Sequence, residues 1–257
     1  MRSPATRSVR KLAFLALQLA PAVAVICLWE LMALSRPELD FTVGSPLGII
    51  RECAALWNRG SLPRDIAVTS VEAFLGFLAG VVLGTLFGLT MWTSRTVFVI
   101  SRPYLVALGS VPVFALAPVF VFWFGTGIWS KVVLGFLSTF VVAVVQAHTG
   151  ATEADPNLLR LIAAFGGSRL DAFRKVIVPS AMIWVLSGIR LNIGMALLGA
   201  FVGEFISSRM GLGYLIIVAQ GLYNVNQIWV GVVCIMAIAV LFHACTMPIE
   251  KWANRWK

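Results

Sequence analysis

Three ionisable side chains interrupt long apolar stretches of this sequence: Glu72, Arg190 and Glu204. A charged group inside a bilayer is costly, so it marks a site that binds a solute, a gate, or a contact between helices. Arg190 has the charge to hold an anionic solute, or to pair with a carboxylate such as Glu72 or with backbone carbonyl groups. Glu204 follows Gly203 near the end of its stretch, where it fits a gate or a helix-end anchor.

No pattern for bond-making chemistry accompanies these residues. His148 and His243 have no companion at metal-ligand spacing, and the four cysteines contain no Cys-x-x-Cys pair, so no metal site is expected. Ser187-Gly188 lacks the Gly-x-Ser-Gly surroundings of an intramembrane serine protease. The sequence also lacks the Gly-x-x-x-x-Gly-Lys-Ser/Thr loop that cradles nucleotide phosphates. We therefore expect neither an enzyme nor a cofactor bound by this chain.

The composition places these residues in a membrane. Hydrophobic residues make up 60% of the chain and charged residues 12%, whereas about a quarter of the residues of a soluble domain are charged. Six apolar segments approach the ~20 residues that cross a bilayer. We predict an all-α membrane protein in which residues 1–257 form one transmembrane domain, with spans near 12–34, 67–92, 103–124, 129–147, 180–203 and 228–247.

The excess of nine positive charges follows from topology. With the N-terminus in the cytoplasm, thirteen Lys and Arg residues lie on the cytoplasmic side and six, among them Lys131, on the outer side. This distribution follows the positive-inside rule and predicts a multi-pass protein with both termini in the cytoplasm. The lipid bilayer accounts for the basic character, and no nucleic-acid partner is expected.

Glycine and proline predict how two of the spans are built. Gly76, Gly80, Gly84 and Gly88 form one smooth stripe, which lets another helix approach closely; packing inside one subunit is favoured over a dimer motif. Pro103, Pro112 and Pro118 fall in the third span, and an internal proline kinks or breaks a helix.

Broken membrane helices often line a route for solute. The candidate pathway residues are therefore Glu72, Pro112, Pro118, Arg190, Asn192 and Glu204.

Between the fourth and fifth spans, the segment LLRLIAAFGGSRLDAFRKVIVP has the pattern of two short helices. Asp155-Pro156 is a helix start, and Gly166-Gly167 ends that helix. Ser168 and Asp171 have capping-box spacing and open a second helix, and Pro179 marks the entry to the fifth span. Each arm has an apolar face and a basic rim. Such a hairpin either lies against anionic lipid or docks into a groove of a soluble partner.

This hairpin resembles the cytoplasmic loop of ABC-importer permeases, whose signature runs Glu-Ala-Ala, three residues, Gly, nine residues, Ile-x-Leu-Pro. With Gly166 as the signature glycine, the spacing places Val178 and Pro179 at the last two positions. Arg160 replaces the glutamate, and Leu161-Ile162 the two alanines. The segments VPVFALAPVFVFWFGTGIWSK, SGIRLNIGMAL and GEFISSRMGLGYLI are similar to the nitrate/sulfonate/taurine branch of these permeases.

The resemblance implies the type I ABC importer permease fold in a bacterial inner membrane. It implies a second copy of this chain, two cytoplasmic ATPase subunits that bind the ATP, and an extracytoplasmic solute-binding protein. The residues expected to couple to the ATPases are Arg160, Leu161, Ala163, Ala164, Phe165, Gly166, Gly167, Ser168, Arg169, Asp171, Phe173, Arg174 and Pro179.

The solute class stays open at this stage. The branch implies a small anion or small organic solute such as nitrate, a sulfonate, taurine or bicarbonate. Glu72 stands where many members of the branch have arginine, which leaves a vitamin precursor such as a pyrimidine or flavin, or an aromatic acid, as the alternative. A secondary transporter is a further alternative, but it would not need the hairpin. The transmembrane component of an energy-coupling-factor importer is another, which the Gly166-to-Pro179 spacing disfavours.

Overall fold

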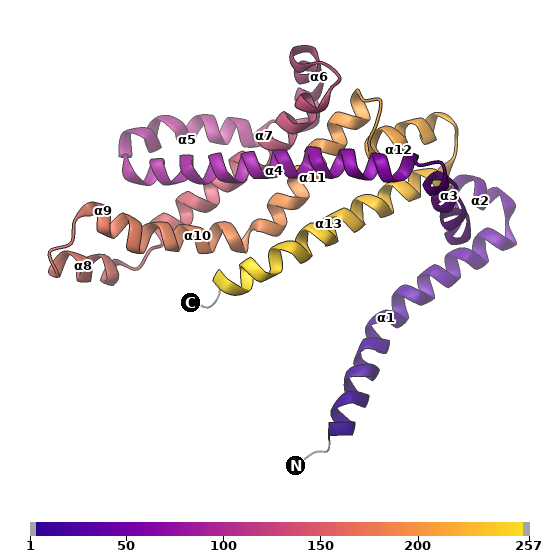
Figure 1. The fold of residues 1–257 in the computed structure, drawn as a ribbon, viewed down its shortest axis with the longest axis horizontal. Helices are drawn as coiled ribbons and strands as arrows, with labels where there is room; N and C mark the ends of the chain where they lie inside the picture. The colour runs from indigo at the N-terminus through magenta and orange to yellow at the C-terminus, as the bar shows by residue number, and fades with distance from the viewer. Residues whose placement is uncertain (1–3, 254–257) are drawn as a thin grey trace.

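The computed structural model describes residues 4–253, and within this range every regular element is a helix (Figure 1). The fold class predicted from the sequence is thereby confirmed. In chain order the elements are α1 (Pro4–Ser35), α2 (Pro37–Val43), α3 (Pro46–Asn58), α4 (Ser61–Thr93), α5 (Arg95–Ser110), α6 (Val113–Phe124), α7 (Ile128–Thr152), α8 (Pro156–Ala164), α9 (Arg169–Ala172), the π-helical turn η1 (Phe173–Ile177), α10 (Val178–Ser187), α11 (Ile189–Ile206), α12 (Leu212–Gly221) and α13 (Val225–Ala253).

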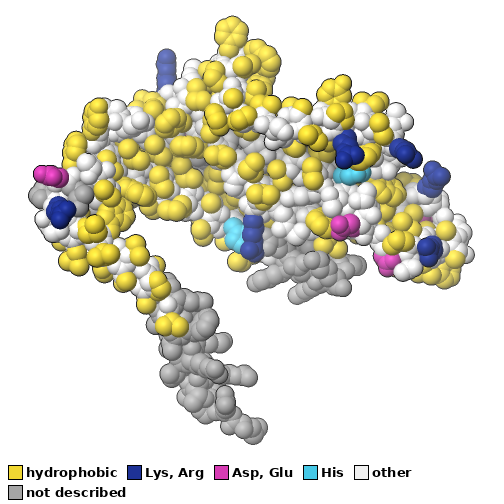
Figure 2. Space-filling model, turned by 180° about the vertical axis from the view of Figure 1, so that it is seen from behind, with side chains coloured by type: hydrophobic (Ala, Val, Ile, Leu, Met, Phe, Trp, Pro, Cys, Tyr) yellow, Lys and Arg dark blue, Asp and Glu magenta, His cyan; other side chains and the backbone are white. Residues whose placement is uncertain are grey.

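Helices of spanning length and apolarity form the body of the molecule. Four meet both criteria in the described part: α4, α7, α11 and residues 225–248 of α13; the bent pair α5–α6 makes a fifth if it is one span. In α1, residues 20–35 form a shorter apolar helix. Apolar side chains cover most of the face in Figure 2, and charged side chains gather mainly toward its two ends.

The helix pair α4 and α7 packs backbone to backbone. A Cβ atom added at Gly84 would lie 2.6 Å from the carbonyl oxygen of Phe140, and one at Gly88 would lie 2.5 Å from that of Val144. Real Cβ atoms essentially never come that close, so only glycine fits at these positions. The glycine stripe therefore serves packing within one chain, as predicted.

Helix α11 meets α7 in the same way. A Cβ atom at Gly199 would lie 2.6 Å from both the Cα and the backbone nitrogen of Gly135. Because α4 and α11 both contact α7, these three helices form a tightly spaced centre that holds the polar and apolar sites described below.

The third predicted span is broken. The axes of α5 and α6 differ by 96° across the short break at Val111–Pro112. Figure 1 shows α5 alongside α4 and α6 turned away from it. Pro112 therefore breaks the span as the sequence predicted, whereas Pro103 and Pro118 lie inside α5 and α6.

The hairpin between α7 and α10 begins as predicted, and its second arm runs directly into the next helix. Asp155 caps α8, and Ser168 and Asp171 form the capping box of α9. The second arm then continues through η1 into α10. A π-turn changes the hydrogen-bond register by one residue, which lets the helix pass Pro179 without ending. Helix α10 begins at Val178 with Pro179 in its first turn, so Pro179 stands at the entry to the next helix, as expected.

Candidate functional site

The start of α12 is held by side chains from two other helices. Its N-cap residue is a glycine without a side chain, although the first N–H groups of a helix need acceptors. Among residues 211–213, the first backbone N–H donates to Asp65 Oδ1 at 2.8 Å, the second to Thr69 Oγ1 at 2.9 Å and the third to Glu204 Oε2 at 2.6 Å. Helices α4 and α11 thus cap α12 from outside.

Around this cap lies a cluster of buried charges. Thr69 donates its hydroxyl hydrogen to Glu204 Oε1 at 2.6 Å, and the carboxyl group of Glu72 lies against that of Glu204. Lys131 is fully buried and donates to the carbonyl oxygens of Thr126 and Gly127. In the described residues no ion pair joins Lys131 to either carboxylate within 4.0 Å. The cluster therefore joins four helices to one another: α4, α7, α11 and α12.

Sequence analysis identified only part of this cluster. Glu72 and Glu204 were predicted, but Asp65 and Thr69 were not, and Lys131 was counted only among the charges of the outer side. Lys131 lies near the start of α7 with no exposed area, so its part in the cluster was not predicted. The sequence did contain one signal for Asp65 and Thr69. Residues 65, 69 and 72 follow the helical period, so they form one polar stripe on a helix.

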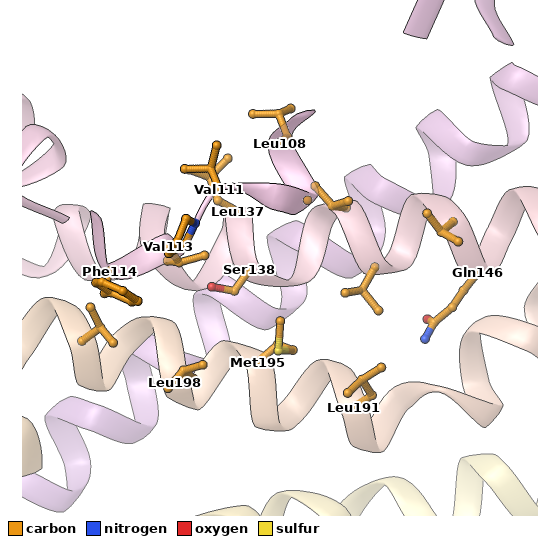
Figure 3. Close-up of a pocket in the computed structure, with 16 residues that line it drawn as sticks. Leu108, Val111, Val113, Phe114, Leu137, Ser138, Gln146, Leu191, Met195 and Leu198 are labelled. Carbon is orange, nitrogen blue, oxygen red and sulfur yellow. The ribbon is translucent and has the colours of Figure 1, made fainter. Parts of the chain in front are cut away.

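A large apolar cavity opens beside the break between α5 and α6 (Figure 3). Its volume is about 640 Å³, and none of its lining residues carries a charge. The polar lining groups are Ser138 and Gln146 of α7. Apolar side chains come from the break, from α7 and from α11, among them Val111, Leu137, Leu191, Met195 and Leu198.

The predicted pathway residues do not all reach this cavity. Pro112 lines it, and the buried Asn192 stands behind it. Asn192 Nδ2 donates to Gln146 Oε1 at 2.9 Å and so orients a side chain that does line the cavity. Arg190 is exposed near the start of α11 and Pro118 is exposed on α6, and neither is part of the lining.

Helices α8 and α9 lie toward the end of the molecule opposite α12 (Figure 1). Helix α8 has no buried residue, and the side chain of Phe165 is 84% exposed, with Leu158 and Leu161 about half exposed. Gly166 then turns the chain with φ +75°, a conformation that favours glycine. Ile162 of the predicted apolar stripe instead packs inward.

Hydrogen bonds fix the second arm of the hairpin. The backbone N–H of Asp171 donates to Ser168 Oγ at 3.2 Å, and that of Ser168 donates to Asp171 Oδ2 at 3.0 Å. Lys175 pairs with Asp171 at 2.9 Å. The hydrogen bond from Ser168, followed by those from Lys175, holds the pKa of Asp171 well below its usual range. The arm is therefore a defined, capped structure although it is exposed.

The sequence matches known transport proteins over most of its length. Residues 80–256 match the family described as "Binding-protein-dependent transport system inner membrane component". A formylaminopyrimidine transport permease of Halalkalibacterium halodurans is 29% identical over 91% of this chain and 92% of its own. A putative aliphatic sulfonates transport permease of Bacillus subtilis is 28% identical over 93% and 86%. Among solved structures, an inward-facing MetNI methionine ABC transporter chain is 16% identical, with a TM-score of 0.67 over 76% of this chain and 97% of that one.

Proposed function

Because the chain belongs to the family of binding-protein-dependent transport system inner membrane components, we propose that two copies of it form the solute pathway of an ATP-driven importer. The pair would span the bacterial inner membrane with its termini in the cytoplasm. Two ATPase subunits would bind the cytoplasmic hairpins, and an extracytoplasmic binding protein would deliver the solute. The exposed, capped hairpin is the observation that carries this assembly.

The hairpin has the features of a docking element. Leu158, Leu161 and Phe165 leave apolar area exposed at a tip that also carries Arg160 and Arg169. Exposed apolar patches rimmed by polar residues mark interaction sites. The sequence holds no phosphate-binding loop of its own, so the ATP must be hydrolysed by the partner that covers this tip.

A displacement of the hairpin would reach the main cavity along one continuous path. The second arm runs through η1 into α10, and α10 meets α11 at Gly188. Helix α11 lines the cavity through Leu191, Met195 and Leu198. Closure of the ATPase pair on ATP binding would therefore move a wall of the cavity and open it outward, and hydrolysis would reset it.

The lining of the main cavity favours a small organic solute over an inorganic anion. A bare anion loses hydration when it is buried and needs cations or several hydrogen-bond donors in return. The cavity offers no charge, and Arg190 is not among its lining residues. A pyrimidine-like solute, as named for the H. halodurans relative, fits this apolar lining better than nitrate or sulfate does.

Co-purification tests the assembly. We expect the tagged chain to bring an ATPase subunit with it from native membranes in mild detergent. Charge reversal at Arg169 and Arg174 should release the ATPase, because both side chains are exposed on the second arm. Reversal at Arg36 and Arg59, which are exposed near the opposite end, is the matched control. Unchanged ATPase recovery with the Arg169 and Arg174 variant would refute the docking assignment.

A further inference from the structure

One polar side chain of the main cavity keeps a hydrogen-bond donor available. Gln146 lines the cavity from α7, and Figure 3 shows its side chain reaching toward α11. Its Nε2 atom has no partner in the described residues and is not fully buried. The other polar lining residue, Ser138, donates its hydroxyl hydrogen to the carbonyl oxygen of Leu134 at 2.8 Å. Gln146 therefore carries the only uncommitted side-chain donor among the residues that line the cavity.

The buried Asn192 fixes the orientation of this amide group. Its Nδ2 atom donates to the carbonyl oxygen of Gly188 at 3.2 Å and to Gln146 Oε1 at 2.9 Å. A backbone carbonyl oxygen can only accept, so the contact with Gly188 determines which end of the Asn192 amide carries the nitrogen. The Gln146 atom that faces this nitrogen must then be the oxygen. Nε2 of Gln146 is left for another acceptor.

Gly188 makes room for the same amide group. A Cβ atom at this position would overlap both Nε2 and Cδ of Gln146. Gly188 stands at the junction of α10 and α11, and Asn192 lies one turn further along α11. Gln146 belongs to α7, but its amide group is held from this junction. A donor held in this way is pre-organised, because little side-chain freedom remains to be lost when a solute binds.

We propose that Gln146 determines solute specificity in the main cavity: its Nε2 atom donates a hydrogen bond to an acceptor on an uncharged organic solute, either a ring nitrogen or a carbonyl oxygen. Asn192 is the positioning residue for this donor. The inference rests on the proposed function, since it names the group that recognises the transported solute.

The surroundings of Gln146 select this class of solute. A solute that fills the cavity displaces water from Nε2, and a donor left without an acceptor in an apolar site is unfavourable. The cavity therefore rejects an analogue that fits but lacks the acceptor. A single neutral donor does not replace the hydration of an anion, and no lining residue carries a charge. An uncharged solute with an acceptor satisfies both conditions.

A matched pair of probes tests this recognition. The full chain in lipid nanodiscs is titrated with 4-amino-2-methylpyrimidine and with 3-methylaniline, at a pH where both are uncharged. The second probe replaces both ring nitrogens by C–H groups and keeps the amino and methyl groups in place. The preference is the ratio of the two Kd values. We expect Gln146→Leu to reduce the wild-type preference for the pyrimidine about fivefold, as the loss of one hydrogen bond predicts.

A second variant tests the positioning role. Asn192→Leu leaves Gln146 in place but removes the group that orients its amide. The preference should fall by a smaller factor than in Gln146→Leu, because the free amide can still reach an acceptor part of the time. A change that affected only the packing of the helices would weaken both probes alike and leave their ratio constant.

A control variant and the assembly assay complete the test. Gln220→Leu makes the same change on an exposed residue of α12 outside the cavity lining, and it should keep the wild-type preference. An unchanged preference in Gln146→Leu would overturn the recognition, and an unchanged preference in Asn192→Leu would overturn the positioning role. Either result obtained while the ATPase still co-purifies would leave the importer assembly standing, so the two failures are distinguishable.

Discussion

The crossing of α11 and α7 makes a quantitative prediction for Gly199→Ala. The added Cβ would lie 2.6 Å from the Cα of Gly135, about 0.8 Å inside the 3.4 Å at which ordinary van der Waals contact begins. The atoms it meets are backbone atoms in the middle of α7, which cannot rotate aside. The two helices must therefore separate or bend.

The expected loss of stability follows from two opposing terms. Overpacking of a tight contact costs about 1–3 kcal/mol, and the higher helix propensity of alanine offsets roughly 0.5–1 kcal/mol. A net loss of about 1–2 kcal/mol should lower the Tm by roughly 2–8 °C for a chain of this size. Uptake should fall as well, because α7 and α11 both line the main cavity.

Gly194→Ala provides a matched control on the same helix. Nothing lies within 4 Å of a Cβ atom at Gly194, so only the propensity gain applies and the Tm should rise slightly. Thermal unfolding in detergent, followed by intrinsic tryptophan fluorescence, measures both variants. A Tm for Gly199→Ala that equals or exceeds that of Gly194→Ala would refute the backbone-contact reasoning.

Two further predictions concern the opposite ends of the molecule. Glu204→Ala removes the acceptor for Thr69 and for an N–H of α12, so it should lower the free energy of unfolding by about 3 kcal/mol or more. Glu204→Gln should lose less in the same thermal assay. Equal Tm values for the wild type and both variants would contradict the cap. At the hairpin, hydrogen bonds lower the pKa of Asp171 in the folded protein. The stability that ionised Asp171 contributes is therefore complete above pH 3.8, the ordinary pKa of an aspartate, and is lost only as the pH falls through the lowered pKa. Hydrogen exchange of residues 168–172, corrected for intrinsic rates, should therefore show constant protection between pH 5 and 8 and faster exchange in Asp171→Asn; loss of protection within that pH range would contradict the assignment.

Local rules predicted the elements whose partners lie close in sequence. The N-cap at Asp155, the stop at Gly166 and the Ser168–Asp171 box each involve residues at most three apart, so their spacing is visible in the sequence. The break at Pro112 follows from the missing N–H and fixed φ of proline. Pro179 likewise stands in the first turn of α10, whereas the π-turn η1 before it was not predicted.

The charge cluster could not be predicted in this way. Thr69 and Glu204 are 135 positions apart, and the carboxylate of Glu204 caps a helix to which it does not belong. Lys131 stands at the start of a span, where the positive-inside count assigns it to the outer side but does not predict its burial. Its burial depends on two carbonyl oxygens of the preceding loop that turn inward to accept from it. Only the tertiary arrangement of α4, α7 and α11 brings these groups together.

The backbone contact between α4 and α7 also limits how this protein can diverge. Every replacement at Gly84 or Gly88 places a Cβ atom less than 3 Å from a carbonyl oxygen, so no other residue fits at these positions unless the two helices move apart. Val82 and Leu86 on the same helix are about half exposed and are open to exchange among apolar residues. New solute preferences must therefore arise by replacing cavity side chains on a scaffold whose helix spacing stays constant.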